Sequence, residues 1–195
     1  MKLPAPTIYR RYGKRLVDLV TAAIACALLA PLFLVLATLV RIRLGSPVLF
    51  RQQRPGLHGK PFVLIKFRTM TDDRDDQGHL RPNAERLTRF GRLMRALSLD
   101  ELPELYNVLR GEMSLVGPRP LFMHFLDRYD PIQARRHEVL PGITGWAQVN
   151  GRRAVSWERK CELDVWYVDH RSFWLDMKVL VLTVCKVAKR EGISS

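Results

Sequence analysis

Two adjacent carboxylates, Asp100 and Glu101, are the residues of this 195-residue chain whose types and spacing best suit a chemical step. A carboxylate can attack phosphorus as a nucleophile, and paired carboxylates can help to hold Mg²⁺ against phosphate groups. A structural explanation fits the same spacing. Ser98, three residues before Glu101, matches a helix capping box, and the helix dipole favours acidic residues in a first turn. The spacing alone leaves both interpretations open.

Several basic residues accompany the carboxylate pair along the chain. Lys66 and Arg68 end an apolar stretch, Arg95 precedes the pair by five residues, and Arg119 lies between two prolines. Prolines stiffen the backbone, so Arg119 is suited to present a planar donor to a phosphate or a base edge. Cations beside a carboxylate pair are typical of phosphoryl transfer. The sequence order does not show that these groups converge.

The charge of the chain points to a polyanionic partner. Lys and Arg total 32 against 19 Asp and Glu, a net charge of +13. Residues 1–71 hold twelve of the basic residues and a single acidic one, Asp18. Nucleic acid, an anionic membrane or a phosphorylated substrate would each fit this excess. Three cysteines without a CxxC pattern argue against a disulfide framework or a zinc ribbon.

An apolar segment at residues 19–40 contains 22 residues without a charge. As a helix it would be roughly 33 Å long, which matches the hydrocarbon core of a bilayer. Basic residues flank both of its ends, and basic flanks mark the cytoplasmic side. Pro31 lies inside the segment and favours a break. We therefore expect a re-entrant membrane helix broken at Pro31, with a kinked spanning helix as the alternative.

The remaining pattern predicts an α+β fold that is mostly α. Short strands are expected at residues 47–52 and 62–67, a mobile loop at 70–83, a stiff loop at 112–120, and a loop or short strand at 141–151. Helices are expected at residues 84–97, 103–109, 121–129, 132–140, 156–170 and 173–189. We expect an N-terminal segment with the membrane helix at 1–43, followed by a membrane-docked domain at 44–195.

The chain resembles the bacterial sugar transferase family, and within it the small monotopic phosphoglycosyl transferases. The resemblance extends from Lys14 to Lys178, nearly the whole chain. The segments that carry it are Lys66–Met70 (KFRTM), Ser98–Glu104 (SLDELPE), Ser114–Pro120 (SLVGPRP), Pro141–Trp146 (PGITGW) and Leu163–Val168 (LDVWYV). Position 30 is Ala, where some members have Ser before the proline.

The resemblance implies a two-step reaction. A UDP-sugar gives its sugar-1-phosphate to undecaprenyl phosphate, and UMP is released. Asp100 would be the nucleophile and become a phosphosugar aspartate, and Glu101 would assist by coordinating Mg²⁺ or by orienting the site. Mg²⁺ is expected near Asp100 and Glu101. Such a reaction would begin a bacterial glycoconjugate assembly pathway.

The resemblance also implies substrate-binding residues. Lys66, Arg95 and Arg119 fall on family positions that line the phosphate and nucleotide site. Arg152 and Asp176 are weaker candidates, and Asp176 could instead cap the last helix.

The expected location is one leaflet of the bacterial inner membrane, with the catalytic domain on the cytoplasmic side. The expected partners are a UDP-sugar, undecaprenyl phosphate and the membrane, and not nucleic acid. The sequence does not determine whether the protein forms a homodimer, which sugar is transferred, or to which pathway the reaction belongs. The alternative is a membrane-anchored basic protein that binds nucleic acid or anionic lipid without catalysis. It would leave the Asp-Glu pair and the Pro-Arg-Pro loop unexplained.

Overall fold

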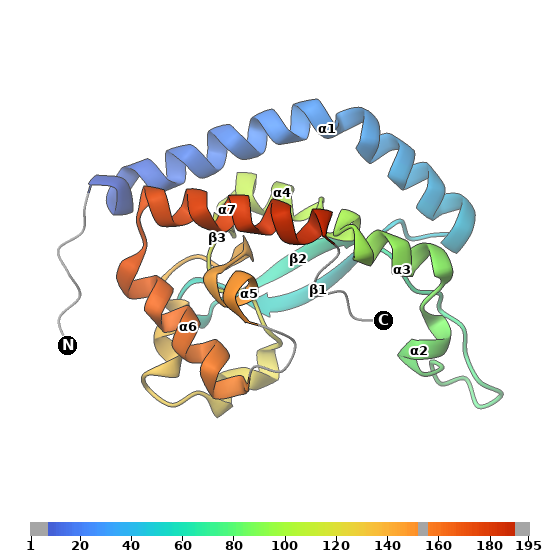
Figure 1. Ribbon diagram of the computed structural model, residues 1–195. Coiled ribbons are helices and arrows are strands. Elements are labelled where there is room, and N and C mark those ends of the chain that lie inside the picture. Colours follow the sequence, from blue (N-terminus) through green and yellow to red (C-terminus); the bar gives the residue numbers. More distant parts are fainter. Residues whose placement is uncertain (1–7, 152–155, 190–195) are drawn as a thin grey trace.

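Figure 1 shows the computed structural model of the protein, in which residues 8–151 and 156–189 are described. A short π-helical turn, η1 (Tyr9–Gly13), leads into the 31-residue helix α1 (Lys14–Leu44). α1 continues through Pro31, so the expected break is absent and the helix arches over the rest of the molecule instead. Proline removes one backbone donor and crowds the preceding turn, which a bend can accommodate without ending the helix.

The surface of α1 is largely apolar and exposed. Within the described residues, the stretch Tyr9–Leu44 is long and apolar enough to cross a membrane, and only 11% of its most apolar window is buried. Its exposed apolar side chains include Leu16, Val20, Ile24, Leu28, Leu34, Val35 and Ile42. Exposed apolar surface on this scale is typical of contact with lipid or a partner protein.

Both ends of α1 pack on the same body of the protein. Near the N-terminal end, Ala22 joins a core cluster that contains Val108 and Val179. Near the C-terminal end, Val40 packs in a second cluster with Met94. The arch therefore returns to the domain from which it starts.

The hairpin of β1 (Leu49–Pro55) and β2 (Pro61–Phe67) confirms the two predicted strands. The strands are antiparallel, with Arg54 opposite Phe62 and Phe50 opposite Lys66. Because side chains alternate along a strand, Arg54 and Lys66 lie on the same face of the hairpin.

A second, parallel sheet joins β3 (Ser114–Val116) to β4 (Gly142–Thr144). The stiff loop expected at 112–120 therefore contains a strand, whereas the loop or strand expected at 141–151 is confirmed and also holds the short helix α5 (Trp146–Asn150). A Cβ at Gly142 would lie 2.1 Å from the backbone nitrogen of Gly117, so this close approach of two chain segments requires glycine.

The helix expected at 84–97 is divided into α2 (Asn83–Arg86) and α3 (Arg89–Ala96). At the division, Leu87 forms an isolated antiparallel bridge with Met70, and the Thr88 hydroxyl caps α3 by accepting from the Gly91 N–H at 3.0 Å. Next come the 3₁₀ turn η3 (Leu99–Glu101) and α4 (Glu104–Arg110), which confirms the helix expected at 103–109.

The prediction of α-helices at 121–129 and 132–140 is wrong in the type of helix. Both segments form 3₁₀ turns, η4 (Met123–Arg128) and η5 (Gln133–Glu138), and a further one, η2 (Leu57–Gly59), lies in the hairpin connection. The last two expected helices are confirmed as α6 (Trp157–His170) and α7 (Phe173–Ala188). In Figure 1, α7 runs beneath α1.

Candidate active site

The carboxylate pair lies on the short turn η3 between α3 and α4. Ser98, which opens this turn, has φ 54°, a left-handed conformation that is costly for a residue other than glycine. Its side chain makes no capping hydrogen bond. The capping box that the spacing allowed is therefore not formed, which removes this structural explanation for the acidic pair.

Glu101 is held by two cations from distant parts of the chain. Lys66 Nζ lies 2.7 Å from Glu101 Oε1, and Arg119 Nη1 donates to Oε2 at 3.2 Å while its Nη2 donates to Oε1. Burial alone would raise the pKa of Glu101, but the charges and hydrogen bonds of Arg119, and then those of Lys66, hold it well below its usual range. Glu101 is therefore ionised, and the sequence-predicted residues Lys66 and Arg119 converge on it.

Glu104 completes this group, and sequence reasoning did not single it out. It is buried on the first turn of α4, and Lys66 Nζ lies 3.0 Å from its Oε1. Burial raises its pKa to about 7, with the Glu101 charge adding to the effect and Lys66 opposing it. The i, i+3 spacing from Glu101 was the available signal. We call Lys66, Glu101, Glu104 and Arg119 the carboxylate clamp.

Asp100 lies beside the clamp but is not held by it. The residue is 8% exposed, and no described residue forms an ion pair with its carboxylate. Burial, followed by the charge of Glu101, raises its pKa, while Lys66 and Arg95 oppose the rise. A buried carboxylate of raised basicity without an ion-pair partner is a good candidate for a nucleophile.

Contacts with neighbouring elements position Arg95 and the loop that carries Arg119. Arg95 Nε donates to Thr69 Oγ1 at 3.0 Å, which places its charge within reach of Asp100. The backbone carbonyl of Arg119 accepts from Arg136 Nη2 at 2.8 Å. Arg136 is itself buried in an ion pair with Asp164 at 2.7 Å, so this contact fixes the Pro-Arg-Pro loop from behind.

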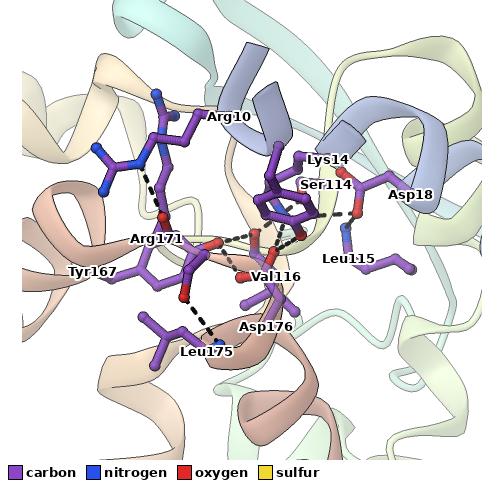
Figure 2. A network of polar contacts seen from close by, with 12 residues as sticks. Arg10, Lys14, Asp18, Ser114, Leu115, Val116, Tyr167, Arg171, Leu175 and Asp176 are labelled. Carbon is purple, nitrogen blue, oxygen red and sulfur yellow. Dashed lines mark hydrogen bonds and ion pairs between the residues drawn. The ribbon is translucent and has the colours of Figure 1, made fainter. Parts of the chain in front are cut away.

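Asp176 belongs to a different group of polar contacts, shown in Figure 2. It accepts from Tyr9 at 2.5 Å and Lys14 at 2.8 Å through one oxygen, and from Tyr167 at 2.7 Å through the other. We call Tyr9, Lys14, Asp18, Tyr167 and Asp176 the anchor network. It ties the base of α1 to α6 and α7, and Asp176 makes no contact with the clamp. The cap of α7 is Ser172, whose hydroxyl accepts from the Leu175 N–H. Arg152 lies outside the described residues.

The donor set near the pair fits one mode of Mg²⁺ binding. Among the described residues, no group of three or more His, Cys, Asp or Glu side chains is arranged to hold a metal ion by itself. Both oxygens of Glu101 already accept from cations, whereas Asp100 is free of ion pairs. Mg²⁺ usually takes one or two carboxylates together with substrate phosphates and water. Asp100 fits that mode, with a phosphorylated substrate supplying further ligands.

Comparison with known proteins identifies the family. Residues 9–190 match the bacterial sugar transferase family. The chain belongs to this family. This sugar transferase is similar to the uncharacterized sugar transferase EpsL of Bacillus subtilis (strain 168), with 62% identity over 180 residues that cover 92% of this chain and 89% of the relative.

Two further relatives of the sugar transferase carry the name UDP-glucose:undecaprenyl-phosphate glucose-1-phosphate transferase. The one from Caulobacter vibrioides (strain ATCC 19089 / CIP 103742 / CB 15) is 42% identical over 191 residues, 93% of this chain and 72% of the relative. The one from Escherichia coli (strain K12) is 40% identical over 186 residues, 90% of this chain. That match spans 40% of the Escherichia coli protein.

Proposed function

We propose that this sugar transferase moves a sugar-1-phosphate from a UDP-sugar to undecaprenyl phosphate, releasing UMP and forming undecaprenyl-diphosphate-sugar. The observation that carries the proposal is the buried, unpaired carboxylate of Asp100 beside a Glu101 that two cations hold ionised. Relatives 40–42% identical to the chain are named for this reaction with UDP-glucose. In a pathway, the product would be the first lipid-linked intermediate of a bacterial glycoconjugate.

In the first step, an Asp100 carboxylate oxygen attacks the sugar-bearing phosphorus of the donor. A carboxylate–phosphorus bond forms, the bond from that phosphorus to the bridging oxygen breaks, and UMP leaves with the electron pair. In the second step, an oxygen of undecaprenyl phosphate attacks the same phosphorus, and Asp100 leaves as a free carboxylate. Two displacements at one phosphorus avoid bringing both substrates together at the same moment.

The cations around the pair meet the charge of the phosphates. Lys66, Arg95 and Arg119 lie close enough to Asp100 and Glu101 to stabilise negative charge as it shifts from the bridging oxygen to UMP. Glu101 holds Lys66 and Arg119 in place by charge and hydrogen bonds. When bound at Asp100, Mg²⁺ would neutralise part of the diphosphate charge.

The arrangement of α1 supports a re-entrant topology on one face of the membrane. Arg15, near the start of α1, donates to the carbonyls of Val108 and Leu109 at 2.7 and 3.2 Å, and Val40 near its end packs with Met94. Both ends are therefore bound to one domain, and in the proposed topology that domain lies on the cytoplasmic side. An apolar arch between two attached ends can enter lipid without moving either end across it.

Release of UMP tests the proposed function. Purified protein with Mg²⁺, undecaprenyl phosphate and a panel of UDP-sugars should release UMP with at least one donor. Asp100→Asn should reduce that release by about 10³-fold or more, because an amide cannot form the acyl phosphate. Asp127→Asn, a change of the same kind at an exposed position, is the matched control and should keep full activity.

A second readout tests the covalent step. Wild-type protein incubated with the donor alone should gain the mass of one sugar phosphate, and Asp100→Asn should not. Full activity of Asp100→Asn would refute the role of Asp100. Absence of UMP release from wild-type protein with every donor would instead favour the non-catalytic basic binding protein.

A further inference from the structure

Arg54, near the end of β1, is a half-buried cation that has no anionic partner among the described residues. Its Nη2 donates to Gln52 Oε1 at 2.7 Å, and its guanidinium carbon lies 3.8 Å from the centre of the Phe122 ring. Its Nε is buried and finds no hydrogen-bond partner within residues 8–151 and 156–189. No carboxylate of the described residues lies within 4 Å of the Arg54 guanidinium. The charge of Glu104 acts from beyond that distance and favours the charged form of Arg54.

Arg54 differs from the neighbouring cations in its ion pairing. Lys66 and Arg119 each have Glu101 as an ion-pair partner, whereas Arg54 has none among the residues described. Burial, and then the nearby positive charge of Arg119, lower the pKa of Arg54. Two partly desolvated guanidinium groups that repel one another, one with an unused donor, form an arrangement that an anion between them would stabilise.

The stack on Phe122 fixes the orientation of the free donors. Arginine stacks on aromatic faces, and the contact fixes the guanidinium plane without using its hydrogen-bond donors. Arg54 also lies on the same hairpin face as Lys66, so β1 and β2 present both cations on one side. Pro55, the next residue, lines a small cavity together with Arg119.

We propose that Arg54 is a further binding residue for the diphosphate of the nucleotide donor, with Phe122 as its positioning residue. The proposal rests on the proposed function, because it assigns a further contact to the same donor. Undecaprenyl phosphate is the other source of a phosphate group at this site. We assign Arg54 to the donor because β1 leads away from the C-terminal end of α1 (Figure 1), and Arg54 lies near the far end of this strand.

Binding of UDP to the full-length protein in lipid nanodiscs tests the assignment without turnover. Arg54→Gln should weaken UDP binding by about 10- to 100-fold, the range expected for a charge-assisted hydrogen bond to phosphate. Arg51→Gln is the matched control, because Arg51 is an exposed arginine of the same strand on the opposite face. It removes the same charge and should leave UDP binding unchanged. Binding of uridine, which has no phosphate, should be equal in both variants.

Kinetics separate the two sources of phosphate. Arg54→Gln should raise the KM for the UDP-sugar and leave the KM for undecaprenyl phosphate unchanged. Phe122→Leu should raise the donor KM by a smaller factor, about 3-fold, because the charge is kept and only its orientation is loosened. Arg54→Lys should recover part of the donor affinity, since it keeps the charge and loses the planar fork.

The outcomes distinguish this inference from the proposed function. If wild-type protein releases UMP and Arg54→Gln binds UDP as tightly as Arg51→Gln does, the role of Arg54 is refuted and the reaction stands. A rise in the KM for undecaprenyl phosphate alone also refutes the donor assignment. If wild-type protein neither binds UDP nor releases UMP, both proposals are refuted together.

Discussion

Two lysines in this chain each bridge two carboxylates, and their surroundings differ. In the carboxylate clamp, Lys66 lies 2.7 and 3.0 Å from its two partners. In the anchor network, Lys14 lies 3.7 and 2.8 Å from Asp18 and Asp176. Beside the clamp, a third carboxylate, that of Asp100, has no ion-pair partner in the described part of the chain, whereas in the anchor network Asp176 accepts from three donors.

The difference shows what an ion-pair cluster needs in order to do chemistry. In the anchor network, the carboxylates also accept hydrogen bonds from neutral donors, the two tyrosine hydroxyls and the Leu115 N–H, which hold the charges in a fixed arrangement. The clamp instead contains a second cation, Arg119, whose side chain is 34% exposed and can meet a ligand. A cluster in which each carboxylate has a cation partner joins elements together, while a cluster that lies beside an unpaired carboxylate and contains an accessible cation can act on a substrate.

Replacing each lysine by methionine is the strongest test of the difference between the two clusters. Lys14→Met should destabilise the protein by about 3–5 kcal/mol, because it leaves two buried carboxylates without their cation. Lys66→Met should cost less stability, since Arg119 still holds Glu101, but should reduce UMP release by about 10²-fold. Thermal unfolding and initial rates measured on both variants check this. Equal losses of stability and of rate in the two variants would remove the distinction.

The exposed cation of the clamp gives the next largest effect. Arg119→Ala should lower kcat/KM for the donor by about 10- to 100-fold, because a charge-assisted contact with phosphate is lost. The melting temperature should change little, since the Pro-Arg-Pro loop is held through the Arg119 backbone carbonyl, which the substitution keeps. Steady-state kinetics and a melting curve on one preparation provide the measurement. A large fall in melting temperature with an unchanged donor KM would contradict the role in donor binding.

The buried carboxylate of Glu104 in the clamp predicts a dependence of stability on pH. The pKa of Glu104 is raised to about 7, so between about pH 4.5 and 7 the folded state keeps a proton that the unfolded state has released. Glu104 therefore makes the protein less stable as pH rises through this window, by on the order of 2 kcal/mol. Glu104→Gln should flatten that part of the stability curve. Denaturant unfolding at several pH values checks the slope, and an unchanged slope would contradict the assignment.

The smallest effect is expected at Pro31. Pro31→Leu should straighten α1 locally but leave its flanks on the same side of the membrane, because both ends are attached to one domain. Single cysteines introduced near residues 10 and 43, labelled from outside sealed vesicles, report the side of each flank. Labelling of the two flanks on opposite sides would show that Pro31, and not the attachment of the ends, determines the topology.

Much of the site was predictable because its motifs are contiguous. Asp100, Glu101, Lys66 and Arg119 were all identified from short segments, and the structure brings them together as the proposed chemistry requires. Glu104 was missed because its importance comes from burial against Lys66, and a sequence does not display burial directly.

The fold departs from the sequence prediction where long-range contacts decide the outcome. The strand at 114–116 exists because it pairs with residues 142–144, a pairing that depends on the close approach of Gly117 and Gly142. The single helix expected at 84–97 divides at Leu87, which forms an isolated antiparallel bridge with the distant residue Met70. The hydrophobic periodicity of a short sequence window contains no signal for either interaction.

The attachment of both ends of α1 has a consequence for the shape of the membrane. In the proposed topology, the apolar arch displaces lipid from one leaflet and leaves the other untouched. The area of the occupied leaflet then exceeds that of its partner, which favours outward curvature on that side. Because the arch is braced by the domain at both ends, it cannot relieve this mismatch by tilting, as a free helix can. The protein should therefore bind small, highly curved vesicles more tightly than large, flat ones.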